Sequence, residues 1–184
     1  LLIFGTNLLY KAAFKGISPH AVLFAVYAFI IWFTIKWHEQ PKIKYAWALG
    51  ISCGLAILAR PSEIVCLVIP LFWGVTGLSS FRMKLKLLMK NYQHLVVIAL
   101  SIFIIWLPQL IYWKVITGRI LYYSYDNPGE GFEFLRPYIW QVLFSFRKGW
   151  LIYTPMMIFS LIGFYYVYRK NRAIFLPIVI FFIL

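Results

Sequence analysis

Acidic residues are scarce in this sequence. Five Asp and Glu stand against 18 Lys and Arg in a chain of 184 residues, and only 12% of the residues are charged. Paired carboxylates supply the acid and the base in many enzymes, so the shortage leaves few candidates for that chemistry. Glu130 and Glu133 could form such a pair, although a solvated loop face is the commoner explanation for two acids beside glycine and phenylalanine.

Familiar catalytic and metal-binding patterns are also missing. Cys53 and Cys66 both lie in apolar runs without CxxC spacing, which is typical of small core residues. His20, His38 and His94 are far apart in the sequence, so no metal ligand set and no cofactor site can be identified. No P-loop, G-x-S-x-G or H-E-x-x-H motif is present. Without a soluble basic domain, the net charge of +13 suits anionic lipid as a partner better than nucleic acid, and we expect no nucleic-acid partner.

Apolar residues are abundant instead. Hydrophobic residues make up 63% of the chain and aromatic residues 21%. A soluble domain of this size could not bury so much apolar surface, whereas runs of about 15 to 20 apolar residues suit a bilayer. We therefore predict an all-α fold, a polytopic transmembrane helical bundle, with residues 1–184 forming a single transmembrane domain. The six predicted apolar segments are 21–37, 45–59, 63–78, 95–113, 150–168 and 173 onward.

The loops between these segments differ in charge, and this difference predicts a topology. Loops 36–44, 79–94 and 169–172 are basic, which places them on the cytoplasmic side by the positive-inside rule. Strict alternation then places the turn 60–62 and the long loop 114–149 on the outer face. The chain begins without methionine and ends within an apolar run, so we expect an internal fragment of a longer protein.

The segment 45–59 is short for a membrane span. At about 1.5 Å per residue it reaches only about 23 Å, against about 30 Å for the hydrocarbon layer. Arg60 should therefore lie below the outer membrane surface, where a cation normally faces a cavity or a partner. Pro61 suits the first turn of the next helix, whose free N–H groups with Arg60 would form an anion site. An ion pair between Arg60 and Glu63 is the alternative, and the spacing leaves both open.

Gly50 and Gly54 stand at G-x-x-x-G spacing in the same segment. Glycines at this spacing allow a second helix to approach closely. We expect the partner to be another helix of this chain rather than a second copy.

The outer loop 114–149 alternates cations with aromatic residues. Aromatic faces can stack on sugars and cations can pair with phosphate, but an aromatic belt with snorkelling cations has the same composition. Arg147 and Lys148 directly precede the segment 150–168, where they either snorkel to the membrane surface or hold an anion. Residues 139–146 could form a short interfacial helix before them.

The order of landmarks resembles a known family. The stretches "FGTNLLYKAAFKGISPHAVLFAVYAF", "GLAILARPSEIVCLVIPLFWG", "YWKVITGRILYYSYDNPGEGFEF" and "LFSFRKGWLIYTPMM" are similar to bacterial GT-C type glycosyltransferases of family 39. These are relatives of protein O-mannosyltransferases and of the lipid A aminoarabinose transferase, and the Bacteroidetes versions are the most similar. The resemblance covers essentially the whole chain through short, scattered motifs.

The resemblance implies an enzyme that transfers a sugar from a polyprenyl-phosphate carrier to an acceptor on the outer face of the bacterial inner membrane. It implies that Arg60 and the tyrosine of a Tyr-x-Pro element, Tyr153, contact the carrier phosphate. Arg147 and Lys148 would then border the same cavity. The loop residues that would contact the acceptor or the sugar are Tyr122, Tyr125, Asp126 and Glu130.

The catalytic base cannot be assigned within this chain. The family carries its acidic motif in the first outer loop, which would lie upstream of Leu1. The superfamily includes metal-assisted and metal-free enzymes, and the chain offers no ligands for a divalent metal. A non-catalytic, transporter-like or scaffold membrane subunit is the alternative function, because such a subunit could keep the fold without the chemistry.

Overall fold

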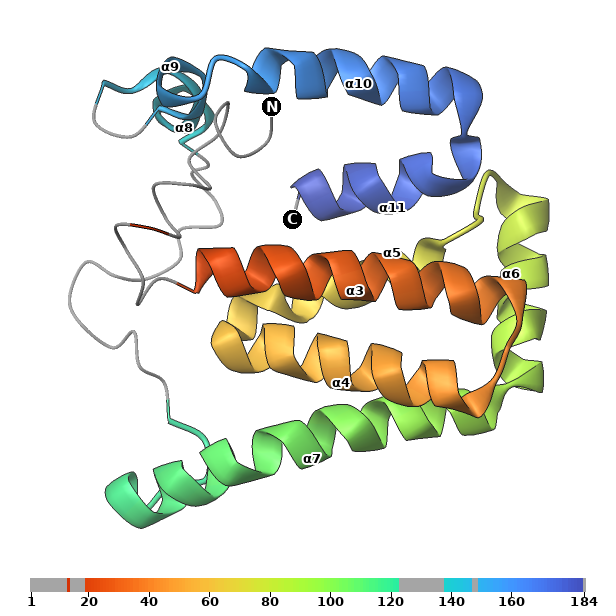
Figure 1. The fold of residues 1–184 in the computed structure, drawn as a ribbon, viewed down its shortest axis with the longest axis vertical. Coiled ribbons are helices and arrows are strands. Elements are labelled where there is room, and N and C mark those ends of the chain that lie inside the picture. The colour runs from red at the N-terminus through yellow and green to blue at the C-terminus, as the bar shows by residue number, and fades with distance from the viewer. Residues whose placement is uncertain (1–12, 14–18, 123–137, 147–148, 184) are drawn as a thin grey trace.

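The computed structural model describes residues 13, 19–122, 138–146 and 149–183. The described part of the chain is helical and contains no strand, which confirms the all-α prediction (Figure 1). The helices are α3 (His20–Glu39), α4 (Ile43–Ala59), η1 (Pro61–Leu67), α5 (Val68–Phe72), α6 (Leu78–Lys90), α7 (Tyr92–Thr117), α8 (Ile139–Phe144), α9 (Trp150–Tyr153), α10 (Met157–Lys170) and α11 (Arg172–Ile183).

The core lies between α3, α4 and the segment formed by η1 and α5. Leu23, Val26 and Ile30 recur every three to four residues on one face of α3, the spacing that brings side chains to the same side of a helix. They pack in one cluster with Cys53 of α4 and Cys66 of η1. Both cysteines are buried and free, so their interpretation as small core residues is confirmed.

Helix α7 packs against α4 through the two glycines. A Cβ atom on Gly50 would lie 2.7 Å from Ser101 Cβ, and a Cβ on Gly54 would lie 3.0 Å from Ile105 Cβ. The contact at Gly50 leaves room only for hydrogen, whereas a side chain at Gly54 would require its neighbours on α7 to shift slightly. The prediction that the glycine pair receives another helix of the same chain is confirmed.

Two helices, α3 and α7, are long and apolar enough to cross a membrane. The α7 surface supports this assignment because large apolar side chains such as Val96, Phe103 and Ile111 are more than half exposed. Contiguous exposed apolar surface of this kind is typical of contact with lipid or with another protein.

Two of the predicted apolar segments are not continuous helices. Segment 63–78 is divided into η1 and α5 and ends before Gly74, whose φ of 82° favours glycine. Segment 150–168 is interrupted after α9, because Pro155 cannot donate a backbone hydrogen bond, and resumes as α10. Helix α4 has 17 residues and α11 has 12, so both are shorter than α3 and α7.

The prediction of a loop over residues 79–94 was wrong, because most of this stretch forms α6. Ser80 Oγ accepts hydrogen bonds from the backbone N–H groups of Thr76 and Gly77, each at 2.8 Å. It also donates to the Gly77 carbonyl at 2.8 Å. These bonds define the start of the helix.

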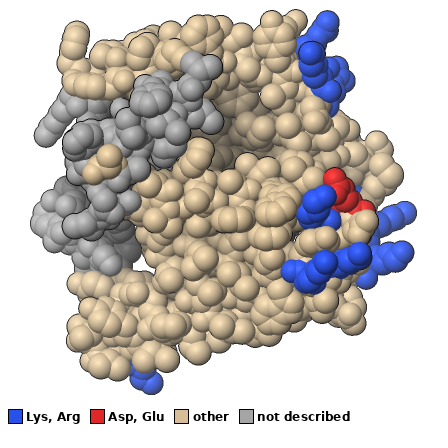
Figure 2. Space-filling model, in the orientation of Figure 1, with Lys and Arg blue, Asp and Glu red and all other residues tan. Residues whose placement is uncertain are grey.

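The three basic stretches lie at one end of the bundle, which we call the basic end (Figures 1 and 2). Two hydrogen bonds connect helix ends there: Trp37 Nε1 donates to His94 Nδ1 at 3.1 Å, and the Gly74 N–H donates to the Ala173 carbonyl at 2.9 Å. The C-terminal ends of α4 and α7 point away from this end (Figure 1). That the basic end faces the cytoplasm stays a prediction.

Candidate functional site

Arg60 stands at the junction of α4 and η1. Its backbone N–H donates to the Ala56 carbonyl at 3.1 Å and closes the last turn of α4. Its extended backbone, with φ of −153° and ψ of 122°, then directs the chain into η1. Pro61 begins η1, where its missing N–H leaves no hydrogen bond unmade. The Arg60 side chain is half-buried, so it keeps some surface for a ligand.

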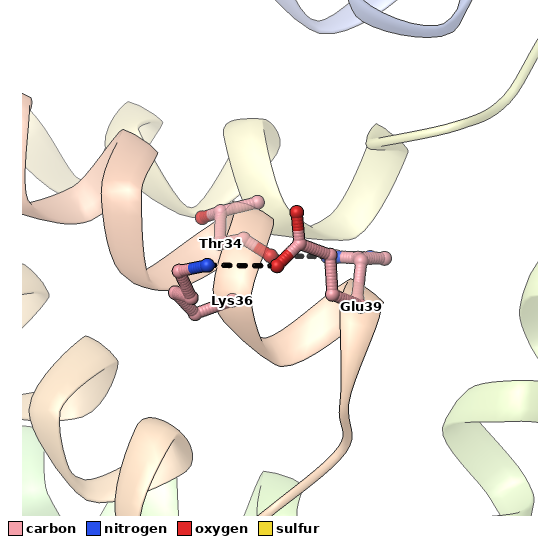
Figure 3. Close-up of polar contacts among 4 residues, drawn as sticks. Thr34, Lys36 and Glu39 are labelled. Carbon is pink, nitrogen blue, oxygen red and sulfur yellow. Dashed lines mark hydrogen bonds and ion pairs between the residues drawn. The ribbon is translucent and has the colours of Figure 1, made fainter.

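The acid closest to Arg60 in the sequence has a different partner. The Tyr27 hydroxyl of α3 donates to Glu63 Oε2 at 2.5 Å. Within the described residues the only ion pair joins Lys36 Nζ and Glu39 Oε2, at 2.9 Å near the end of α3 (Figure 3). The ion pair between Arg60 and Glu63 is therefore not formed, and Arg60 has no acidic partner in the described part of the chain.

The helix that begins at Pro61 is shorter and tighter than expected. It is a 3₁₀-helix of seven residues, and the Glu63 N–H at its start already donates to the Arg60 carbonyl at 2.9 Å. A short helix aligns few peptide dipoles, and a used N–H cannot bind an anion. The guanidinium of Arg60, rather than the helix N-terminus, is thus the group able to attract an anion at this junction.

Arg60 is inset: it lies closer to the middle of the bundle than the C-terminal end of α7 does. Gly54 of α4 lies level with Ile102 and Ile105 of α7, and Gly50 lies level with Ile98 and Ser101, so the two helices run in the same direction. Arg60 follows Gly54 by six residues, so the junction of α4 and η1 lies level with about residue 110 of α7. Helix α7 continues to Thr117, about 10 Å farther at 1.5 Å per residue. That Arg60 lies below the outer membrane surface stays a prediction.

Tyr153 ends α9, and within the described residues no hydrogen bond or ion pair joins it to Arg60. Its hydroxyl donates to the Phe146 carbonyl at 2.5 Å. Helix α9 packs on α8 and α10, whereas α4 packs on α3, α7 and η1. Tyr122 is exposed, five residues after the end of α7. Five predicted site residues lie outside the described residues: Tyr125, Asp126, Glu130, Arg147 and Lys148.

Helix α8 forms where a short interfacial helix was expected. Trp140, Gln141 and Phe144 line a shallow surface hollow on it. Trp140 is 75% exposed, and none of the lining residues was predicted as a site residue. An exposed aromatic helix of this kind agrees with the aromatic-belt interpretation of the loop as well as with a binding role.

A polar cluster at the basic end was missed by the sequence analysis. Lys84 of α6 is buried, donates through Nζ to the Pro70 carbonyl at 2.9 Å and also contacts His38 Nε2. Its Nζ lies 5.7 Å from the centre of the Trp37 ring. Burial lowers the pKa of Lys84 to about 8. The detectable signal was that Lys84 falls between Phe81 and Leu88, at helical spacing on an otherwise apolar face.

No group of three or more His, Cys, Asp or Glu side chains comes together as metal ligands would within the described ranges. His38 and His94 do approach the same tryptophan, Trp37, although the sequence separates them by 56 positions. Each has a partner other than a metal, because His38 Nδ1 lies 2.7 Å from the Thr34 carbonyl and His94 accepts from Trp37.

Comparison with known proteins identifies no relative, since no family model, no curated protein and no solved structure matches the chain. The geometry around Arg60 and the order of sequence landmarks are therefore the basis for a functional interpretation.

Proposed function

We propose that this chain is part of a polytopic, GT-C type glycosyltransferase of the bacterial inner membrane. In this proposal the six apolar segments pass through or into the membrane, and the end that contains Arg60 faces outward. The enzyme transfers a sugar from a polyprenyl-phosphate carrier to an acceptor. The observation that carries the proposal is Arg60: an inset, half-buried arginine without an acidic partner among the described residues.

The chemistry gives Arg60 a defined role. As the glycosidic bond to the carrier breaks, the departing polyprenyl phosphate gains negative charge, and a fixed cation beside it stabilises the transition state. Near the membrane interior the effective dielectric constant is low, so this stabilisation is stronger than in bulk water. Arginine suits the task because its planar fork can bind two phosphate oxygens at once.

The remaining predicted residues have supporting roles. Tyr153, Arg147 and Lys148 border the carrier site from the side of α9, and the loop with Tyr122, Tyr125, Asp126 and Glu130 receives the acceptor or the sugar. The group that acts as general base toward the acceptor stays unassigned. Membrane lipids surround the bundle.

The test measures binding of polyprenyl phosphate without sugar to the full-length protein in neutral detergent. Arg60→Ala should weaken binding about ten- to hundred-fold, since a charge-assisted contact contributes about 1.5 to 3 kcal/mol. Arg60→Lys should keep part of the affinity because the charge remains while the bidentate fork is lost. Arg147→Ala and Lys148→Ala should each have a smaller effect, because each can substitute for the other.

Arg169→Ala is the matched control, since Arg169 is an exposed cation in the last turn of α10. It should bind the carrier lipid as the wild type does. If Arg60→Ala also bound it with wild-type affinity, the phosphate role of Arg60 would be refuted. If binding weakened as expected but a full-length protein with a donor sugar and acceptor showed no transfer, the non-catalytic subunit would become the better account.

A further inference from the structure

Helix α6 is oriented differently from its neighbours. It runs across the ends of α3, α4 and α7 at the basic end, whereas those three helices lie alongside one another (Figure 1). If α3 and α7 cross the membrane, a helix across their ends lies in the plane of the membrane surface. Amphipathic helices commonly occupy this position, at the boundary between headgroups and acyl chains.

One face of α6 is fixed to the bundle. Lys84 is buried and donates to the Pro70 carbonyl of α5, and Phe81 stacks on Phe72 of α5 with 6.4 Å between ring centres. Leu87 and Leu88 on the same side are half-buried. Because three sites on one face are attached, the helix cannot rotate freely, and the residues on its other faces point in set directions.

Two outward stripes lie next to each other on the remaining surface. Arg82, Lys86 and Lys90 recur every four residues and are all exposed. Beside them, Leu78 is 82% exposed and Met89 is 74% exposed, with Leu85 on the same stripe. The sequence of α6 contains no acidic residue that could neutralise the cations. Figure 2 shows Lys and Arg side chains gathered on this side of the molecule.

We propose that α6 is an in-plane helix that binds anionic phospholipid headgroups at the basic end of the bundle. Arg82, Lys86 and Lys90 contact the phosphate groups, while Leu78, Leu85 and Met89 enter the outer part of the acyl layer. Each cation is attracted to the anionic surface, and the apolar stripe adds binding in proportion to the area that it buries. An acidic soluble protein would match the cations but would leave the neighbouring apolar stripe without a suitable environment. This inference does not depend on sugar transfer.

The first experiment counts bound lipid on the full-length protein. Phosphatidylglycerol and phosphatidylcholine are titrated separately into protein in neutral detergent, and bound lipids are counted by native mass spectrometry. Arg82→Gln/Lys86→Gln removes two cations and should weaken phosphatidylglycerol binding about thirtyfold while leaving phosphatidylcholine binding unchanged. The matched control is Lys114→Gln/Arg119→Gln, which removes one exposed lysine and one exposed arginine outside the basic end and should preserve the lipid preference.

The second experiment measures depth in vesicles that contain three parts phosphatidylcholine to one part phosphatidylglycerol. A fluorophore is attached to Met89→Cys or to Lys86→Cys, with Cys53 and Cys66 replaced by alanine. The probe at position 89 should be quenched by lipids brominated on their acyl chains. The probe at position 86 should be quenched by aqueous iodide.

Two results would overturn the proposal. Equal binding of the two lipids by the wild type would remove the anionic preference. Quenching of both probes only by iodide would place α6 away from the bilayer, and the exposed stripes would then be a surface for a soluble acidic partner. All substituted α6 residues are exposed, so their replacement leaves the core unchanged. Because Cys53 and Cys66 are buried, the melting temperature of the cysteine-free protein must match that of the wild type before the probes are compared.

Discussion

The two ends of the bundle hold their cations in different ways. At the basic end, Lys36 pairs with Glu39, Lys84 is buried against neutral acceptors, and Arg172 lies 4.9 Å from the centre of the Tyr168 ring. At the opposite end of α4, Arg60 is half-buried, and the only described acid nearby, Glu63, is bound to Tyr27. Among the described residues, the cations of the basic end are paired, buried against neutral groups or exposed. Away from that end, Lys114 and Arg119 are exposed, whereas Arg60 is half-buried and has no acidic partner within the described ranges.

The two groups of cations indicate two different properties: the orientation of the chain in the membrane and the binding of an anion. Exposed cations are screened by water and salt, so each contributes little alone, but their sum biases which side of a membrane they occupy. An inset cation is screened less and is expensive to leave without an anion. The number of cations therefore indicates topology, whereas the position of one cation indicates a site.

The largest expected effect concerns orientation. Single cysteines at Lys42 and Arg119, both exposed, are introduced in a background without Cys53 and Cys66. A membrane-impermeant maleimide added to intact cells with a permeabilised outer membrane should label Arg119→Cys and leave Lys42→Cys unlabelled. Disruption of the inner membrane should then allow both to react, which controls for accessibility. Labelling of Lys42→Cys alone in intact cells would reverse the two ends and move the proposed site to the cytoplasmic face.

The next effect concerns the packing that sets the depth of Arg60. In Gly50→Ala the new Cβ would lie 2.7 Å from Ser101 Cβ and 2.8 Å from the Ile98 carbonyl oxygen, so α4 and α7 must separate. Overpacking of this kind costs about 1 to 3 kcal/mol, which a thermal unfolding series in detergent can detect. Gly54→Ala should be milder, since its closest contact is 3.0 Å from a side-chain carbon.

Gly163→Ala is the control for helix propensity. A Cβ at Gly163 of α10 meets nothing within 4 Å, so alanine should be neutral or slightly stabilising there. Equal melting temperatures for the variants at positions 50 and 163 would mean that the close approach of α4 and α7 is not maintained in solution.

The sequence predicted those parts of the fold that depend on a single pattern, such as a long apolar run or a pair of glycines. The predicted apolar runs match α3, α4 and α7 within a few residues. An apolar run of this length favours a helix in a protein core or a membrane and few other structures. The packing of another helix on Gly50 and Gly54 also followed from the sequence, since small residues at this spacing commonly allow two helices to approach closely.

The other features depend on contacts between residues that are distant in the sequence, which the pattern of apolar and charged residues does not contain. Four cations in 13 residues predict a loop where α6 forms. The burial of Lys84 depends on contacts with α3 and α5, which are distant in the sequence. Tyr27 and Glu63 are 36 positions apart, so their hydrogen bond could not be foreseen. The expected ion pair between Arg60 and Glu63 was based on their spacing in the sequence. The partner of Glu63 is instead Tyr27, a residue of a different helix.

The smallest expected effect tests that tertiary contact. In Tyr27→Phe the ring keeps its position against Phe181, 5.1 Å between centres, but Glu63 loses its hydrogen-bond donor. The freed carboxylate can then turn toward Arg60 and compete with the carrier phosphate. Polyprenyl phosphate should bind about three- to ten-fold more weakly, in line with the 0.5 to 1.5 kcal/mol of one hydrogen bond.

A second substitution distinguishes competition from simple destabilisation. Tyr27→Phe/Glu63→Gln removes the competing charge, so binding of polyprenyl phosphate should return to near the wild-type level even though the hydroxyl is still absent. If the fold around η1 were merely loosened, the second substitution would not restore affinity, because glutamine cannot rebuild the lost contact with phenylalanine. Persistent weak binding in the double variant, at a melting temperature equal to that of Tyr27→Phe, would show that Tyr27 acts only as a packing residue. Recovery would establish that α3 keeps Glu63 away from Arg60 and so leaves the cation available for an anion.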